Sequence, residues 1–273
     1  MTAKQRYFIE LAYDGTNYHG WQIQQNAVSV QEVLNKALAT ILRQPVETTG
    51  CGRTDTGVHA REFFAHFDLG VHGSLVMDHG NGEKPDSSAV NSHEPLTMNY
   101  ERTVASLNAI LPNDIAIKNI IPLHEDAHAR FDAILRSYQY HIHFNKDPFL
   151  QGHSWQVRDV PDIELMNRAA AIIMEYIDFS CFSKSNTQVK TNNCKIIRAE
   201  WVKTEQGMVF HISADRFLRN MVRAIVGTLM MVGKHEIPPE AVRQIIESKN
   251  RSNAGTSVPA CGLYLTEVKY SYL

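Results

Sequence analysis

Residues 6–15 read RYFIELAYDG, a run of β-forming side chains that stops at the turn dipeptide Asp14-Gly15. This pattern predicts a strand ended by a turn. Ser29-Val30-Gln31-Glu32 then has the form of a helix capping box, and apolar residues follow it at helical spacing. Two more strands are predicted at 46–51 and 62–67, on either side of the loop GRTDTG. Residues 1–69 therefore predict a β-α-β-loop-β unit, in which a helix lies on a sheet.

The rest of the chain continues this mixture of strands and helices. Residues 70–96 are rich in Gly, Pro, Ser and Asn and carry few aliphatic side chains, which predicts an insert. Further helices are predicted at 101–111, 162–176, 217–232 and 239–248, and strands at 115–121, 134–144, 196–204, 208–214 and 263–270. These elements predict an α+β protein with an N-terminal subdomain at 1–112 and a C-terminal subdomain at 113–273.

The composition is that of a folded protein without a large charge excess. Of the 273 residues, 44% are hydrophobic and 21% are charged, which argues against an intrinsically disordered chain. The formal charge of −2 gives no global sign of a nucleic-acid partner. Between Cys181 and Arg223, however, eight basic side chains stand against three acidic ones. This local excess fits either an RNA-binding face or an ordinary solvated surface.

Cysteine and histidine usage argues against a disulfide framework or a metal centre. The four cysteines are far apart and form no Cys-x-x-Cys pair, and no His-x-x-x-His pair lies on a predicted helix. The chain has no stretch of about 18 apolar residues, and no apolar signal segment opens it. We therefore expect reduced thiols, no bound metal, no membrane span and a cytoplasmic location.

The densest candidate for chemistry is the loop at 49–59, TGCGRTDTGVH, which places three glycines around Arg53 and Asp55. Glycines allow positive φ angles and the close approach of a ligand. The spacing matches neither a phosphate-binding Walker loop nor a dinucleotide fingerprint. From the residues alone, the loop is either a binding loop or a tight connection in which Asp55 caps backbone amides.

Two other features could serve RNA. Arg216, Arg219 and Arg223 follow an i, i+3, i+7 spacing that predicts one shared helical face, suited either to phosphates or to solvent. Arg223 borders an uncharged half-helix, so we expect it to have a carboxylate partner. Tyr138 lies beside Arg136 on a predicted strand and fits either base stacking or core packing.

Six motifs together resemble the bacterial tRNA pseudouridine synthase A family, in the order in which that family has them. They are Tyr13–Gln24, Gly52–Ala60, Ala129–Ala133 with Arg136–Tyr138, Asp178–Phe182, Phe217–Gly233 and Gly262–Leu265. The chain departs from the common pattern at Thr56, where alanine is usual, at Tyr18, where phenylalanine is common, and at Arg219, where histidine is frequent. These positions flank the expected site and include no reacting group.

The resemblance implies a fold and an activity. The fold has two subdomains whose mainly antiparallel sheets join into one central sheet flanked by helices, with an active-site cleft between them. The activity is isomerisation of uridine to pseudouridine in the anticodon stem-loop of tRNA, at about positions 38 to 40. The resemblance also implies a homodimer that binds tRNA, without a metal or an organic cofactor.

The same resemblance assigns roles to residues. Asp55 is the catalytic carboxylate, and Arg223 is its ion-pair partner. Tyr138 lies against the flipped uracil and can act in removing the C5 proton, Leu265 forms a wall of the site, and Arg53 assists base flipping. The residues expected to contact tRNA are Arg53, Arg130, Arg136, Lys146 and Arg219.

Two alternatives remain from the residues. A non-catalytic RNA-binding protein would keep the basic face and Tyr138 without needing an Asp55–Arg223 pair. A metal-dependent hydrolase would use Asp14, Asp55, His19 and His59.

Overall fold

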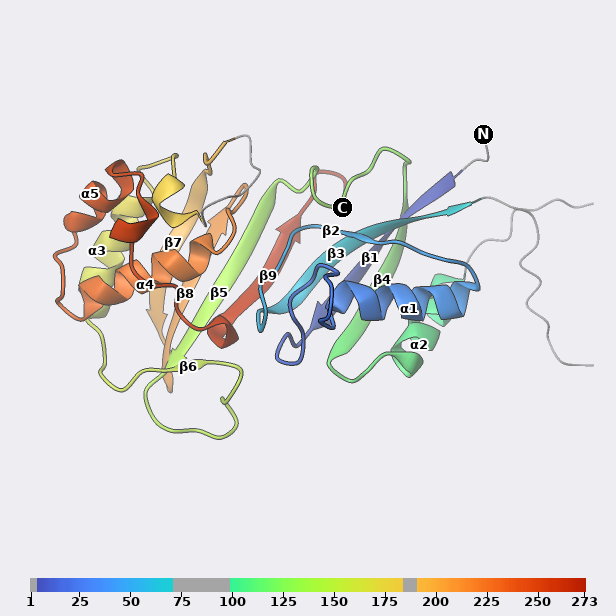
Figure 1. Cartoon of the computed structure of the whole chain (residues 1–273), viewed down its shortest axis with the longest axis horizontal. Coiled ribbons are helices and arrows are strands. Elements are labelled where there is room, and N and C mark those ends of the chain that lie inside the picture. The colour runs from blue at the N-terminus through green and yellow to red at the C-terminus, as the bar shows by residue number, and fades with distance from the viewer. Residues whose placement is uncertain (1–3, 71–98, 184–190) are drawn as a thin grey trace, which may run out of the picture.

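The computed structural model describes residues 4–70, 99–183 and 191–273. The predicted insert lies outside these residues from position 71 onward. The centre of the fold is a nine-stranded sheet (Figure 1). Seven of its strands have the order β4-β1-β3-β9-β5-β8-β7, and the two short strands β2 and β6 pair with β3 and β5. The strands are β1 (Lys4–Tyr13), β2 (Thr49–Gly50), β3 (His59–Gly70), β4 (Ile115–Leu123), β5 (Leu135–His143), β6 (Trp155–Gln156), β7 (Ile196–Lys203), β8 (Gly207–Ala214) and β9 (Leu263–Lys269).

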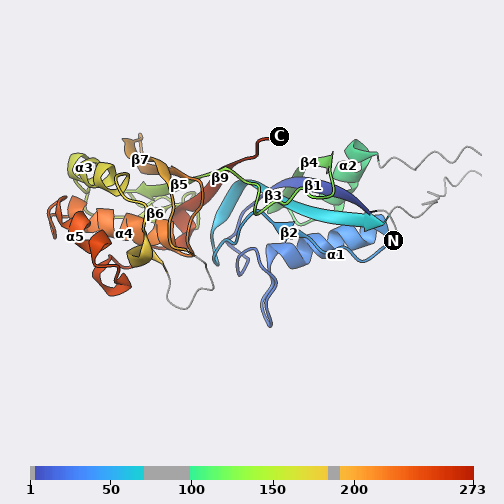
Figure 2. The same cartoon turned by 90° about the horizontal axis from the view of Figure 1, so that it is seen from above.

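The helices form two groups at opposite ends of an elongated molecule (Figures 1 and 2). One group accompanies the N-terminal strands and comprises α1 (Val30–Leu42) and α2 (Tyr100–Ile110). The other comprises α3 (Ile163–Ile173), α4 (Met221–Gly233) and α5 (Ala241–Glu247). The predicted capping box is present in part, because the Ser29 side chain accepts a hydrogen bond from the Glu32 amide at the start of α1.

The last strand joins the two halves of the sheet. β9 pairs in parallel with β3, which belongs to the N-terminal half, and antiparallel with β5, which belongs to the C-terminal half. Apart from β3 with β9 and β5 with β6, the strand pairs are antiparallel. The prediction of an α+β protein with one mainly antiparallel central sheet is therefore confirmed.

Two apolar cores fill the ends of the molecule. Phe8, Trp21 and Phe63 belong to the N-terminal core, and Phe182 and Phe210 belong to the C-terminal core. Tyr138 on β5 packs against both cores. β4, which follows the proposed subdomain boundary at 112/113, pairs with β1 in the N-terminal half. The boundary itself stays a prediction.

Two local predictions differ from the structure. The strand predicted at 46–51 is limited to Thr49–Gly50, because the chain turns away after one short pairing with β3. The helix predicted from Phe217 begins at Met221, because Asn220 adopts a φ of 66° and interrupts the helical backbone. Arg216 and Arg219 therefore precede the helix, and the prediction that they share one helical face with Arg223 is wrong. No helix within the described residues is long and apolar enough to cross a membrane.

Candidate active site

The loop between β2 and β3 carries Asp55 and is held by the segment after β1. Trp21 N donates to Thr54 O at 3.4 Å, and Gly57 N donates to Tyr18 O at 3.3 Å. The backbones touch so closely that a Cβ on Gly20, whose φ is +83°, would lie 2.2 Å from Thr54 O. Only glycine fits there, so the opening motif of the chain acts as the support for the loop.

The opposite wall of the site is the first turn of α4, which carries Arg223. A Cβ on Gly227 would lie 1.9 Å from Thr256 O, so glycine lets the 255–258 segment pack directly on this helix. In that position Val258 O accepts a hydrogen bond from Arg223 Nε at 2.7 Å. The guanidinium is thereby aimed before any substrate arrives.

Asp55 lies between two arginines. Arg223 Nη1 is 3.4 Å from Asp55 Oδ2, and Arg219 Nε is 3.8 Å from Asp55 Oδ1. The side chains of Asp55 and Arg223 are 27% and 20% exposed, whereas that of Arg219 is 58% exposed. Arg223 is therefore the better-shielded partner, since water screens the outer pair more strongly. The arrangement presents an ionised carboxylate that a substrate can reach.

Tyr138 lies on the neighbouring strand and contributes an aromatic ring near the same site. It is paired with Leu265 on β9 in the register of the sheet. Its ring meets the ring of Phe217 edge-on, with centroids 5.1 Å apart and planes at 88°. Burial raises the pKa of its hydroxyl well above the ordinary value, and the negative charge of Asp55 acts in the same direction. The phenol is therefore neutral and can donate a proton near the carboxylate.

Comparison with known proteins identifies the family. Residues 176–271 match the family model described as tRNA pseudouridine synthase. The tRNA pseudouridine synthase A of Porphyromonas gingivalis is 50% identical over 267 residues, which is 97% of each chain. The protein of the same name from Bacteroides fragilis is 47% identical over 267 residues, which is 97% of this chain and 96% of that one. The chain belongs to the tRNA pseudouridine synthase A family. The resemblance based on six motifs is thus confirmed, as is the prediction of an isomerase, because pseudouridine is an isomer of uridine.

The other residues expected to serve this pseudouridine synthase lie in three kinds of environment. Leu265 is next to Tyr138 but only 1% exposed, so in this state it is a core side chain. Arg53, Arg130 and Lys146 are exposed on loops. Their expected contacts with RNA stay predictions.

Arg136, also expected to contact tRNA, is almost entirely buried. Only 9% of the residue is exposed. Its two terminal nitrogens donate to four backbone carbonyl oxygens, at distances of 2.7 to 3.3 Å, namely those of Cys51, Arg130, Ala133 and Asp215. These bonds engage four of the five N–H groups of the guanidinium, which argues against a role in holding a phosphate, and the expected contact of Arg136 with tRNA stays a prediction. Its contacts instead tie three loops together.

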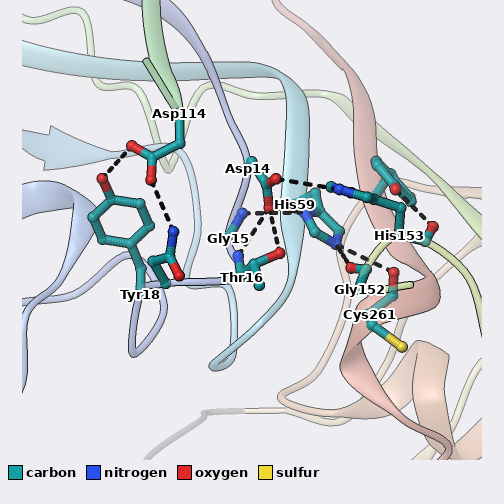
Figure 3. Close-up of polar contacts among 11 residues, drawn as sticks. Asp14, Gly15, Thr16, Tyr18, His59, Asp114, Gly152, His153 and Cys261 are labelled. Atoms are coloured by element: carbon teal, nitrogen blue, oxygen red, sulfur yellow. Dashed lines mark hydrogen bonds and ion pairs between the residues drawn. The ribbon is translucent and has the colours of Figure 1, made fainter. Parts of the chain in front are cut away.

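A second polar cluster of the synthase joins Asp14, His59 and His153 (Figure 3). His59 Nε2 lies 3.0 Å from Gly152 O and 3.2 Å from Cys261 O, and since carbonyls only accept, this nitrogen carries the proton. His59 Nδ1 accepts from Gly15 N at 3.1 Å and lies 2.9 Å from Asp14 Oδ1. The cluster links the end of β1 to loops of the C-terminal half.

The protonation of this cluster follows from its surroundings. Burial lowers the pKa of His59, which is 2% exposed, although the charge of Asp14 opposes that shift. Burial alone would raise the pKa of Asp14, but hydrogen bonds from Thr16 and the nearby rings of His59 and His153 lower it below its ordinary value. Asp14 is therefore ionised at neutral pH, and its charge opposes the effect of burial on His59.

The donor atoms of Asp14, His59 and His153 all lie within 4.8 Å of one another, a set whose types suit a transition metal. However, His59 Nδ1 already accepts from Gly15 N, and Asp14 Oδ1 accepts from the amide and hydroxyl of Thr16. The predicted hydrolase set is not assembled either, because Asp55 pairs with arginines and His19 is not among these donors. His153 was missed by the sequence analysis, since no spacing rule connects it with Asp14.

Proposed function

We propose that this chain converts uridine to pseudouridine in the anticodon stem-loop of tRNA, at about positions 38 to 40, with Asp55 as the catalytic carboxylate. The observation that carries the assignment is the partly exposed Asp55, which faces Arg223 at 3.4 Å on a loop held by backbone contacts from the opening motif. The family membership supports the reaction class.

The chemistry requires nothing from outside the substrate. The bond between N1 and C1′ breaks, the uracil turns, a bond forms between C5 and C1′, C5 loses a proton and N1 gains one. No atom is added and no electron is transferred, so an ionised carboxylate suffices. Asp55 can act as a nucleophile on ribose or base, or as the base that removes a ribose proton. Arg223 and Arg219 face its two oxygens and direct the carboxylate in each case.

The target uridine must leave its stack before Asp55 can reach it. Extrusion of a stacked base costs roughly a few kcal/mol of free energy. Contacts in the active site must offset this cost. Arg53, exposed two residues before Asp55, is positioned to fill the vacated space. Tyr138 would then lie against the flipped uracil, where its neutral phenol can donate a hydrogen bond. The C5 proton would go to a base other than this phenol, a role that the Asp55 carboxylate can fill.

We further propose that the enzyme works as a cytoplasmic homodimer that binds tRNA without a metal or organic cofactor. The proposal rests on the family resemblance and, for the absence of a cofactor, on the balance of the reaction. Gel filtration coupled to light scattering, with and without tRNA, tests the stoichiometry.

The decisive experiment incubates the purified protein, in EDTA, with an unmodified tRNA transcript that carries uridines on the 3′ side of its anticodon arm. Carbodiimide treatment and primer extension then map pseudouridine. New stops in the anticodon arm, absent with Asp55→Asn, are the expected result. Tight binding without stops on several transcripts would favour a non-catalytic RNA-binding protein, and activity that requires added metal would favour a metal-dependent enzyme.

A further inference from the structure

The exposed aromatic ring of Phe131 lies beside Arg130 and has no role in the function proposed above. Phe131 is 74% exposed, on the turn that connects β4 to β5. One face of its ring is covered by the guanidinium of Arg130, whose Cζ is 5.6 Å from the ring centroid, and the ring of His128 lies 4.2 Å away. The large exposed fraction shows that much of the phenyl ring remains free.

The turn that carries Phe131 is firmly anchored, so the exposure of the ring is imposed by the fold. Tyr270 donates its hydroxyl hydrogen to Ala129 O at 2.6 Å, and Tyr272 donates to Asp132 Oδ2 at 2.9 Å. Ala129 itself is fully buried. On this turn the chain thus buries Ala127, Ala129 and Ala133 and leaves the large apolar side chains of Phe131 and Ile134 exposed.

The buried Arg136 brings three basic segments to the same place. Its Nη2 donates to both Cys51 O and Arg130 O, so these two carbonyls lie within reach of a single atom. Its Nη1 donates to Asp215 O. An arginine lies at or within two residues of each of these three carbonyl groups, namely Arg53, Arg130 and Arg216.

These three arginines form a local positive region. Within residues 4–70, 99–183 and 191–273, none of the three has a carboxylate within ion-pair distance. Burial lowers the pKa of Arg130, and the positive charges of Arg53, Arg136 and Arg216 lower it further. Such mutual repulsion is relieved by an anion, and a largely exposed aromatic ring beside a cation suits an unstacked base with its phosphate.

We propose that Phe131, Arg130 and Arg216 form a nucleotide subsite next to Arg53, in which an unpaired base of the tRNA near the target uridine stacks on Phe131 and its phosphate is held by Arg130 and Arg216. This subsite rests on the proposed function, since Arg53 connects it to the Asp55 loop. It explains why an apolar ring is held in solvent among cations.

The test compares Phe131→Ala with Phe131→Tyr and with Phe149→Ala, using the full chain and the unmodified tRNA transcript. Phe149 is a matched control because it is 88% exposed on a different loop, beside Asp147. Loss of one stacking side chain is expected to raise the Kd by about five- to 150-fold, since a stacked base contributes roughly that much affinity. Phe131→Tyr should bind within about twofold of wild type, and so should Phe149→Ala.

Salt dependence separates the base contact from the phosphate contact. Phe131→Ala should leave the slope of log Kd against log salt unchanged, whereas Arg216→Gln should reduce it by about one phosphate contact. Wild-type affinity of Phe131→Ala overturns the subsite. A change of oligomeric state in Phe131→Ala, measured by light scattering, also overturns it and assigns the ring to a contact between copies. Pseudouridine mapping on wild type runs in parallel, so that failure of the activity itself is recognised separately.

Discussion

Asp55 and Asp14 are carboxylates on two segments that pack against each other, yet their surroundings differ. Among the described residues, Asp55 accepts one long hydrogen bond, from Arg223, and both of its cationic neighbours are permanently charged. Asp14 Oδ1 already accepts from the amide and hydroxyl of Thr16, and the neighbours of Asp14 are titratable histidines. The Asp14 carboxylate accepts hydrogen bonds within its own turn and therefore stabilises the fold. The Asp55 carboxylate keeps oxygen lone pairs that can accept hydrogen bonds from a substrate.

The strongest test of this comparison is the pair Asp55→Asn and Asp14→Asn. We expect Asp55→Asn to lower kcat by about a thousandfold or more, because the amide cannot serve as nucleophile or base. Its Kd for tRNA should stay within a few-fold of wild type. Pseudouridine formation over time, with contaminating wild-type enzyme excluded, provides the measurement. Comparable losses of kcat in the two variants would remove the distinction drawn between them.

The two arginines around Asp55 should differ in importance. We expect Arg223→Met to lower kcat by about one hundredfold, because it removes the shielded cation that directs the carboxylate. Arg219→Gln should lower kcat by less than about tenfold, because that pair is solvent-screened. Single-turnover rates at saturating enzyme give both values. Equal effects would mean that exposure does not decide the strength of these pairs.

Asp14→Asn should affect folding more than chemistry. The substitution weakens hydrogen bonds from Thr16 and changes the contact with His59, for which we expect a loss of about 1 kcal/mol in the free energy of unfolding. Urea denaturation followed by circular dichroism measures this loss. Thr16→Val, which removes only the hydroxyl donor, should produce a smaller loss. Unchanged stability in both variants would argue against a structural role for the Asp14 turn.

Acid should destabilise the protein through its buried histidines. Burial lowers the pKa of His66 and of His141 from 6.5 to about 4, and it also lowers that of His59. Each therefore binds fewer protons when folded than when unfolded, so its stabilising contribution is present above pH 6.5 and is lost as the pH falls from 6.5 towards about 4. Urea midpoints between pH 7 and 4.5 should fall, and His66→Gln should fall less steeply than wild type.

The smallest effect is expected from chelation. Backbone and hydroxyl donors already occupy Asp14 Oδ1 and His59 Nδ1. We therefore expect EDTA to change the activity by less than about a tenth and the thermal midpoint by less than about 1 °C. His153→Ala should behave similarly in the presence and absence of EDTA. A clear loss of thermal midpoint on chelation, absent in His153→Ala, would instead establish a bound cation at this cluster.

Much of the architecture could be predicted from local patterns. The helix predicted after Ser29 and the strand before Asp14-Gly15 lie where their periodicity and turn residues placed them. The start of α4 could not be predicted, because its apolar spacing continues through Phe217 while Asn220 turns the backbone. At the site, the expectation of a carboxylate partner for Arg223 followed from its place beside an uncharged half-helix, and the structure supplies Asp55.

Hydrophobic periodicity, turn chemistry and motifs are local properties of a chain, and they are enough to predict most of the elements, the family and the candidate residues. Which charges meet depends on the folding of distant segments against each other. Asp55 meets Arg223 across 168 positions, Arg136 reaches Cys51 across 85, and His59 reaches Cys261 across 202. Such contacts depend on how β9 joins the two halves of the sheet. Burial then separates the arginines: the buried Arg136 holds loops together, and the exposed Arg130 is available for RNA, as we propose.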